Sequence, residues 1–299
     1  MSAIEREIAS QPTAWRRAAA LALDAADDLP PVGGRLAVIG CGTSLYMAQA
    51  YAAVRESAGA GETDAFAASE MPAGRRYDAV LAISRSGTTT EVVRALGQVP
   101  DAVPTHAVVG VAGTPVADGA DRVVVLDFAD EKSVVQTRFA TTALVFLLAG
   151  LGQDFEQAVA EAEHALVREL SAHSLAARSF VFLGRGWTVG IANEAALKLR
   201  EAALAWAESY PALEYRHGPI ALAGPGTLVW AFGDVGEDLL GDVRDTGATV
   251  VANGHHPLAE LVLAQRTAVA LARARSLDPD RPRNLTRSVV LSSHGKAVR

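Results

Sequence analysis

Three features are scarce in this sequence, and each scarcity argues against a class of protein. One cysteine, Cys41, occurs among 299 residues, so no disulfide can form within the chain and a reducing compartment fits. No uncharged apolar run reaches the about 20 residues that span a bilayer, and the opening residues, MSAIERE, carry charges in place of the apolar core of a signal peptide. Basic residues number 27 against 34 acidic ones, a net charge of −7, which argues against a nucleic-acid partner. We therefore expect a cytoplasmic protein with no membrane and no nucleic-acid partner.

Half of the residues are hydrophobic, and the length suffices for two domains of ordinary size. Short apolar runs alternate with helical patterns, which predicts α/β architecture with mainly parallel sheets flanked by helices. The expected strands are residues 35–39, 63–68, 79–83, 106–111, 122–126, 179–183, 227–232 and 248–251. The longer expected helices are residues 45–58, 134–151, 154–173, 191–208, 237–246 and 258–275. We predict an N-terminal helical segment (1–29), a first domain (30–152), a second domain (153–277) and an irregular C-terminal tail (278–299).

A glycine turn follows a strand at two places, which indicates a weak internal repeat. An apolar run leads into Gly-x-Gly at Gly40 to Ser44 and again at Gly184 to Thr188. Neither turn has the third glycine of a dinucleotide fingerprint at the right place, and no P-loop sequence occurs. In parallel sheets ligands bind beyond the carboxyl ends of the strands, where both turns are expected to lie.

The stretch from Ala79 to Glu91 has the composition of a phosphate site. An apolar strand pattern gives way to a turn rich in hydroxyl groups with one glycine, Gly87, and then to a helical pattern from Glu91 to Leu96. Hydroxyl donors, a close backbone and the free N–H groups of a helix start favour an anion. The same pattern also fits an ordinary capped strand–turn–helix. We interpret the stretch as a cradle for a phosphate monoester.

Charged residues interrupt an otherwise apolar helical pattern in the second half of the chain. Glu194, Lys198 and Glu201 stand at i, i+4 and i+7, so they share one helix face. Such a stripe is often solvated and salt-bridged, but a desolvated glutamate beside a lysine can serve as a general base. His217 precedes Gly-Pro, so we expect it on a loop, where it could move protons. The adjacent pair His255-His256 lacks nearby acids or cysteines that would complete a metal site.

Taken together, these motifs resemble the sugar isomerase (SIS) domain family. The order matches double-SIS proteins such as the isomerase half of glucosamine-6-phosphate synthase, amino-sugar-phosphate deaminases and fructosamine-phosphate deglycases. The resemblance runs from about residue 35 to residue 290. The matching segments are GCGTS (40–44), SRSGTT (84–89), SVVQTR (133–138), GRG (184–186), EAALKLRE (194–201), HGP (217–219) and PRNL (282–285).

The resemblance implies two SIS domains, each a three-layer α/β/α, flavodoxin-like sheet, and an enzyme that acts on a sugar phosphate without metal or organic cofactor. Glu201 would remove the proton from C2, and His217, supplied by the second subunit of a homodimer, would help to open the sugar ring. Lys198 and Glu194 would line the site. The phosphate would be held by Ser44, Ser84, Arg85, Ser86 and Thr89. Further substrate-lining residues would be Gly42, Thr43, Gln136, Thr137 and Arg287.

Three departures from the synthase pattern shape the expected reaction. The chain starts almost at the first SIS domain, so we expect no glutamine-dependent amination. Arg287 stands where the synthases have a lysine, and a guanidinium does not readily form a Schiff base; Lys296 is out of register. Arg85 replaces a neutral amide, which adds charge opposite a phosphate.

These observations leave several outcomes open. We favour C2 proton abstraction on an amino-sugar 6-phosphate, glucosamine 6-phosphate or its N-acetyl form, of isomerase or deaminase type. One alternative is a dehydratase that expels the C3 hydroxyl of an N-acetylhexosamine 6-phosphate. Another is a non-catalytic phosphosugar sensor, although such regulators usually carry a DNA-binding domain, for which residues 1–29 are too short.

Overall fold

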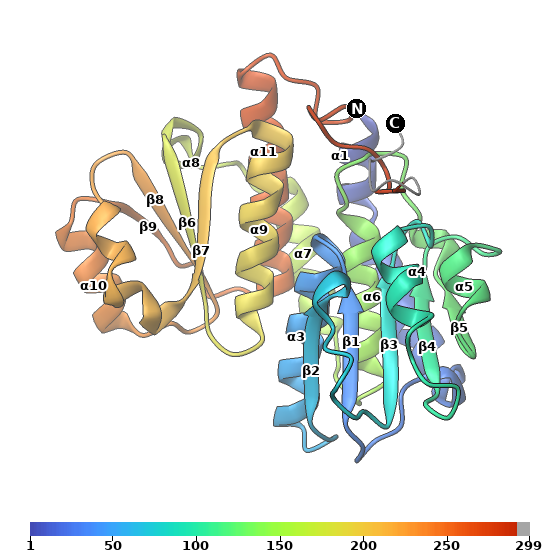
Figure 1. Ribbon diagram of the computed structural model, residues 1–299. Coiled ribbons are helices and arrows are strands. Elements are labelled where there is room, and N and C mark those ends of the chain that lie inside the picture. The colour runs from blue at the N-terminus through green and yellow to red at the C-terminus, as the bar shows by residue number, and fades with distance from the viewer. Residues whose placement is uncertain (292–299) are drawn as a thin grey trace. The chain divides into compact units, whose positions relative to one another are not determined.

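A computed structural model describes residues 1–291, and the chain forms two compact units (Figure 1). Of the described residues, the five-strand unit comprises 13–155 and 284–291, and the four-strand unit comprises 1–12 and 156–283. Both units are therefore discontinuous in sequence, whereas we predicted four consecutive segments. The N-terminal helix α1 (Ala3–Ala9) belongs to the four-strand unit because the carboxylate of Asp280 accepts the N–H groups of Ala3 and Ile4, at 2.8 Å each.

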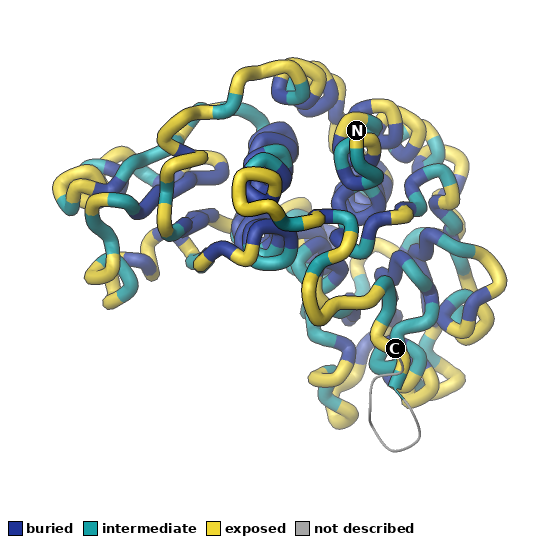
Figure 2. The backbone as a smooth tube through the Cα atoms, turned by 90° about the horizontal axis from the view of Figure 1, so that it is seen from above, coloured by how far each residue is buried: buried dark blue, intermediate teal, exposed yellow. Residues whose placement is uncertain are grey.

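The five-strand unit has a parallel sheet in the order β2-β1-β3-β4-β5. Every residue of β1, β3 and β4 is buried, as expected for inner strands of a parallel sheet that is covered on both faces (Figure 2). The strands are β1 (Leu36–Gly40), β2 (Thr63–Ala67), β3 (Ala79–Ser84), β4 (Thr105–Val109) and β5 (Arg122–Val125).

Helices cover this sheet and complete a three-layer arrangement. The helix α3 packs on β1 and β2 and against α6, whereas α4 and α5 pack on β3 and β4. Alternate residues of the inner strands form a core with α4 and α5, including Ile39, Ala82 and Val92. The helices are α2 (Gln11–Asp24), α3 (Thr43–Ser57), α4 (Thr90–Leu96), α5 (Pro115–Asp118) and α6 (Arg138–Ala149).

The four-strand unit repeats this plan with one strand fewer, in the parallel order β7-β6-β8-β9. The helix α9 packs on β6 and β7 and against α11. The strands are β6 (Ser179–Gly184), β7 (Trp206–Pro211), β8 (Thr227–Phe232) and β9 (Thr249–Val251). Its further helices are α7 (Glu156–Val167), α8 (Ala172–Ala176), α9 (Thr188–Ala203), α10 (Glu237–Asp245) and α11 (Pro257–Ala274).

The predicted α/β class with two mainly parallel, helix-flanked sheets is confirmed, and three helix predictions were wrong in extent. The helix expected over 134–151 begins only at Arg138. The stretch 154–173 forms α7 and the separate short helix α8. The helix expected over 191–208 ends at Ala203, because Leu204 adopts a left-handed conformation (φ 50°) and the chain continues as the edge strand β7. No helix within residues 1–291 is long and apolar enough to cross a membrane.

Candidate active site

The predicted phosphate cradle lies between β3 and α4, at the carboxyl end of an inner strand. The turn is tight, since the Gly87 N–H donates to Ser84 Oγ and the Thr88 N–H donates to Ser86 Oγ, both at 3.2 Å. Gly87 has φ +65°, and a Cβ atom there would lie 2.0 Å from Thr114 Oγ1. Glycine is therefore required at this position on two grounds.

The C-terminal segment 286–291 lies against this turn, which the sequence did not indicate. Ser288 Oγ accepts hydrogen bonds from Ser86 Oγ (3.1 Å) and Thr88 Oγ1 (2.9 Å). The Thr90 N–H donates to Val289 O at 3.2 Å. Ser288 is about 200 residues from its partners in the chain, so no local pattern could have revealed it.

Arg85, a predicted phosphate ligand, donates hydrogen bonds to the backbone of two other segments. Its side chain is buried, and its guanidinium donates to the carbonyl groups of Ser133 (2.8 Å) and Arg287 (2.7 Å). Arg85 thus joins three chain segments around the cradle. We interpret it as a residue that holds the cradle in shape.

The first glycine turn places Ser44 in the opening turn of α3. Gly42, with φ 55°, precedes the helix, and Thr43 and Ser44 are its first two residues and are buried. A Cβ atom on Gly40 would lie 2.7 Å from the carbonyl carbon of Ser44, so the strand end and the helix start approach closely. The predicted ligands Ser44, Ser84, Ser86 and Thr89 thus all lie where strands β1 and β3 lead into helices of the same unit. Burial raises the pKa of the Cys41 thiol, which argues against a reactive cysteine here.

Residues 131–138 form a cap for α6, which explains why this helix starts late. The Glu131 carboxylate accepts the N–H groups of Thr137 and Arg138 (2.7 Å each) and the Thr137 hydroxyl (2.8 Å). Thr137 is fully buried and its hydroxyl donates within this cap, so its expected role in lining the substrate stays a prediction. The side-chain oxygen of Gln136 is buried without a hydrogen-bond partner in the described chain, so Gln136 stays a candidate.

Arg287, which stands where the synthases have a lysine, is bound by residues of the five-strand unit. Its guanidinium donates to the Asp130 carboxylate and to the Glu131 carbonyl. The expected substrate-lining role of Arg287 would require it to leave these partners. Lys296 lies outside the described residues.

The charged stripe on α9 is buried rather than solvated. Glu194 and Lys198 are 0% and 1% exposed, and Lys198 Nζ lies 3.4 Å from Glu194 Oε1 and 2.6 Å from Glu201 Oε2. The Glu201 side chain keeps 18% of its surface. Buried charges are costly unless paired, so a carboxylate held here at the edge of solvent is a suitable general base.

A cavity of about 130 Å³ lies beside Glu201 within the four-strand unit. It is bounded by the end of α9 and by residues 276–283 after α11. Leu204 and Ser276, both lining it, are non-glycine residues with positive φ of 50° and 55°. Strained backbone of this kind is common at functional sites.

His217 ends the 3₁₀ helix η4 (Ala212–His217) instead of lying on an irregular loop. The turn breaks at Gly218, whose φ is 136°. The imidazole is exposed. It is therefore available to contact another molecule, as the predicted role across a dimer interface requires.

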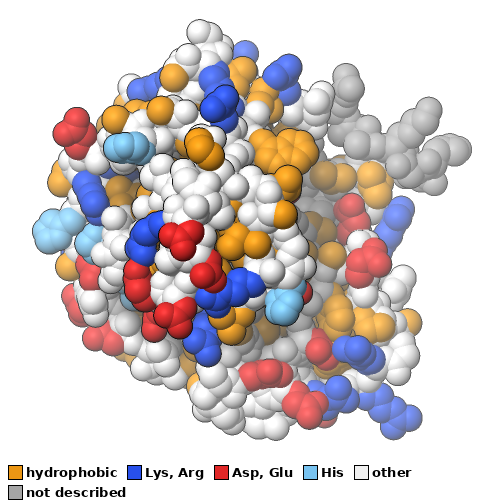
Figure 3. Space-filling model, turned by 90° about the vertical axis from the view of Figure 1, so that its left-hand side faces the viewer, with side chains coloured by type: hydrophobic (Ala, Val, Ile, Leu, Met, Phe, Trp, Pro, Cys, Tyr) orange, Lys and Arg blue, Asp and Glu red, His pale blue; other side chains and the backbone are white. Residues whose placement is uncertain are grey.

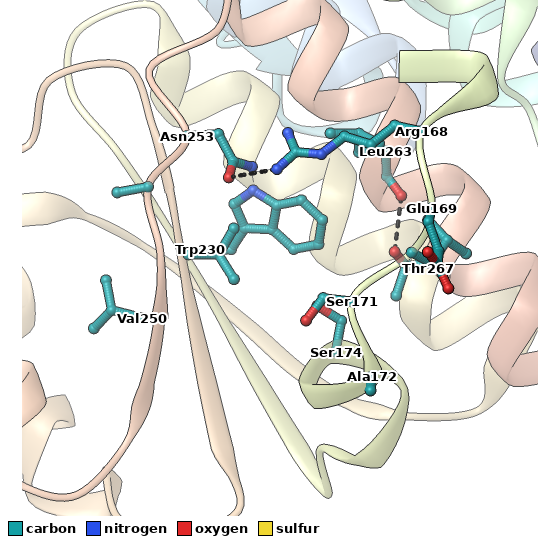
Figure 4. A pocket seen from close by; sticks show the side chains of 13 residues that line it. Arg168, Glu169, Ser171, Ala172, Ser174, Trp230, Val250, Asn253, Leu263 and Thr267 are labelled. Atoms are coloured by element: carbon teal, nitrogen blue, oxygen red, sulfur yellow. Dashed lines mark hydrogen bonds between the residues drawn. The ribbon is translucent and has the colours of Figure 1, made fainter. Parts of the chain in front are cut away.

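A separate cavity of the four-strand unit contains none of the predicted site residues. It measures about 580 Å³ and lies between β8, β9, α8 and α11. Figure 4 shows Trp230 at its centre with Asn253 and Arg168 beside it. The indole N–H and the Asn253 amide donate to the buried Glu260 carboxylate at 2.8 and 3.0 Å. Among the described residues no cluster of histidine, cysteine and acidic side chains could hold a metal ion.

Comparison with known proteins identifies the architecture. No protein-family model matches the sequence. The chain is 29% identical to a glutamine–fructose-6-phosphate aminotransferase (isomerizing) from Methanothermobacter thermautotrophicus, over 86% of this chain and 52% of the relative. It thus spans about half the length of that relative. The crystal structure of a glucosamine-6-phosphate deaminase from Thermotoga maritima superposes with a TM-score of 0.83 and 26% identity, and covers 97% of this chain and 100% of the other.

In sequence and in fold the chain resembles proteins of the sugar isomerase (SIS) domain family. A tagatose-6-phosphate ketose/aldose isomerase from Escherichia coli has the same fold, with a TM-score of 0.76, 20% identity and coverage of 93% and 95%. At that identity the likeness concerns the fold alone. Together the comparisons support a sugar-phosphate isomerase-type function for this protein.

Proposed function

We propose that this protein is an enzyme that acts on an amino-sugar 6-phosphate by removing the proton from C2, as an isomerase or deaminase. The observation that carries the proposal is the buried Glu194–Lys198–Glu201 cluster, in which only Glu201 reaches solvent. The names of the relatives, which act on fructose 6-phosphate or glucosamine 6-phosphate, support the substrate class.

The chemistry follows from the properties of a carbon acid. Glu201 takes the C2 proton of the open-chain sugar, and the electron pair of the C–H bond forms a C1–C2 double bond while the carbonyl oxygen gains the charge. Cations and hydrogen-bond donors near that oxygen lower the barrier. Return of the proton to C1 gives the isomer. With an amine at C2 the isomer is an imine, and its hydrolysis consumes water and releases ammonia.

The ester end of the sugar would be held by the turn between β3 and α4. Ser84, Ser86 and Thr89 supply hydroxyl groups, with Ser44 at the start of α3. Because α4 has only seven residues, the hydroxyl groups rather than a long helix dipole would carry the binding. His217 of a second copy in a homodimer would assist ring opening.

A second candidate, a dehydratase, is favoured by Arg287. Its guanidinium is held by Asp130 and Glu131 and cannot readily form the Schiff base expected of a lysine. In an N-acetylated substrate the nitrogen at C2 is a poor leaving group. The same enolate could then collapse with loss of the C3 hydroxyl as water.

The deciding experiment is incubation of the protein with glucosamine 6-phosphate, N-acetylglucosamine 6-phosphate and fructose 6-phosphate in deuterated water. Ammonia release with deuterium at C1 of the ketose product selects a deaminase, and isomer formation without ammonia release selects an isomerase. A new ultraviolet chromophore from the N-acetyl sugar selects the dehydratase. Binding without exchange at C2 of either glucosamine sugar and without exchange at C1 of fructose 6-phosphate would contradict the enzyme proposal and leave a sensor.

A further inference from the structure

The hydroxyl of Ser288 occupies a position in the cradle that suits an anionic oxygen. Ser86 Oγ and Thr88 Oγ1 come from the β3–α4 turn, and both donate to Ser288 Oγ, at 3.1 and 2.9 Å. Two hydroxyl donors that converge on one oxygen are the arrangement that a phosphate oxygen requires. Three hydroxyl groups from two distant segments therefore meet at one point.

The segment that carries Ser288 is fixed on both sides of it. Before Ser288, the Arg287 side chain is bound by Asp130 and Glu131, and its carbonyl accepts from Arg85 at 2.7 Å. After Ser288, the Leu291 N–H donates to Thr90 Oγ1 at 2.9 Å. These bonds involve a buried arginine and the start of α4, so the position of Ser288 is built into the five-strand unit.

Part of the backbone at α4 is already occupied by this segment. The Thr90 N–H, in the first turn of α4, donates to Val289 O. An incoming anion would therefore depend more on hydroxyl donors than on this amide. A serine hydroxyl can rotate and changes from acceptor to donor at little cost.

We propose that Ser288 is a further ligand of the phosphate monoester, supplied by the C-terminal segment and acting together with Ser86 and Thr88. Without ligand, Ser288 Oγ accepts from the two turn hydroxyls. With ligand, all three hydroxyls donate to the phosphate oxygens. This inference rests on the proposed function and names one residue, Ser288, that the sequence motifs did not assign.

The test compares Ser288→Ala with the wild type by calorimetric titration with inorganic phosphate and by the KM for the sugar phosphate that turns over. A hydrogen bond to a charged group contributes more binding free energy than one to a neutral group. We therefore expect Kd and KM to rise by about 10-fold or more, with kcat little changed. Ser288→Thr, which keeps a hydroxyl, should recover most of the affinity. Ser57→Ala, an exposed serine on α3 that bonds only to a helix carbonyl, is the matched control and should change neither value.

Three results would overturn the inference, and they separate it from the proposed function. Unchanged Kd and KM in Ser288→Ala, with a wild type that binds phosphate, would show that the hydroxyl is not a ligand. Tighter binding would show that Ser288 competes with the anion instead of holding it. A wild type that binds neither inorganic phosphate nor any sugar phosphate would overturn both the inference and the cradle.

Discussion

The two units of this protein share one plan and differ in where they carry polar groups. In each unit the first strand leads through a glycine turn into a helix, β1–α3 in one and β6–α9 in the other. In each sheet this first strand lies between the second and third strands of the unit, as β2-β1-β3 and β7-β6-β8. Counted from Gly40 and Gly184, the three residues of the buried charged cluster on α9 fall on uncharged positions of α3. The matching pairs are Ala50 and Glu194, Val54 and Lys198, and Ser57 and Glu201.

The loops after β3 and β8 also differ in their polar groups. After β3 the chain supplies serine and threonine hydroxyls, whereas after β8 it supplies Asp234 and then, in the first turn of α10, Glu237 and Asp238. Figure 3 looks onto this side of the four-strand unit, where acidic and basic side chains are interspersed. A phosphate would be repelled by those carboxylates. One repeat thus suits an anion and the other a buried acid–base group.

The largest expected effect comes from the α9 position that carries the proposed base. Glu201→Gln should lower kcat by about 100- to 10,000-fold, since a positioned general base contributes that much. Binding of the sugar phosphate, measured by titration, should change little. Ser57→Ala, at the matching position of α3, should leave both unchanged. A Glu201→Gln variant with near-normal kcat would refute the assignment.

Substitutions at the matching positions Lys198 of α9 and Val54 of α3 should differ in their effect on the free energy of unfolding. Lys198→Met leaves buried Glu194 without this cation, and breaking a buried pair costs about 3–5 kcal/mol. Val54→Met, at the matching position of α3, should cost less than about 1.5 kcal/mol. Denaturant unfolding of both variants tests this, and Glu194→Gln/Lys198→Met should recover part of the loss. Equal losses for Val54→Met and Lys198→Met would contradict the account.

The two glycine turns should also respond unequally. A Cβ on Gly184 would lie 2.2 Å from the Thr188 carbonyl oxygen, closer than the 2.7 Å at Gly40. Gly184→Ala should therefore lower the free energy of unfolding by about 3 kcal/mol, and Gly40→Ala by less. Gly241→Ala, in open space within α10, should instead gain up to about 1 kcal/mol. If Gly184→Ala left the free energy of unfolding unchanged, Gly184 could not lie as close to the Thr188 carbonyl as the structure shows.

The smallest effect is the contribution of His256, in the four-strand unit, to the pH dependence of stability. Burial lowers the pKa of His256, whose Nδ1 accepts the Leu258 N–H at the start of α11. The unfolded chain then binds a proton more readily than the folded one, so stability is present above the unfolded pKa of about 6.5 and is lost as the pH falls below it. His256→Asn keeps a capping acceptor but does not titrate. Its melting temperature should fall less than that of the wild type between pH 7.5 and 5.5, and an equal fall would exclude this origin.

Much of this fold could be predicted because the inner strands are continuous apolar runs between turn residues. The strand over 227–232 was predicted to the residue. The edge strand β7 was missed because the helical pattern of α9 continues into it. The helix ends at Ala203, and the left-handed residue that follows, Leu204, is not a typical stop signal. Only glycine would have marked that left-handed position in the sequence.

The candidate site was less predictable wherever distant segments meet. The spacing of Glu194, Lys198 and Glu201 predicted a shared face, but not that the face is buried. Arg85 and Thr137 match family motifs, and the structure shows them donating to Ser133, Arg287 and Glu131. Such contacts depend on tertiary packing, which no local pattern encodes.

The most direct test of the central claim is a crystal structure of the Glu201→Gln variant with N-acetylglucosamine 6-phosphate bound. The account predicts phosphate oxygens within hydrogen-bond distance of the Ser84 and Ser86 hydroxyls, and sugar C2 about 3–3.5 Å from the side chain of residue 201 in the same or a neighbouring subunit. A phosphate bound away from the β3–α4 turn, or a C2 atom beyond reach of residue 201 in every subunit, would contradict it.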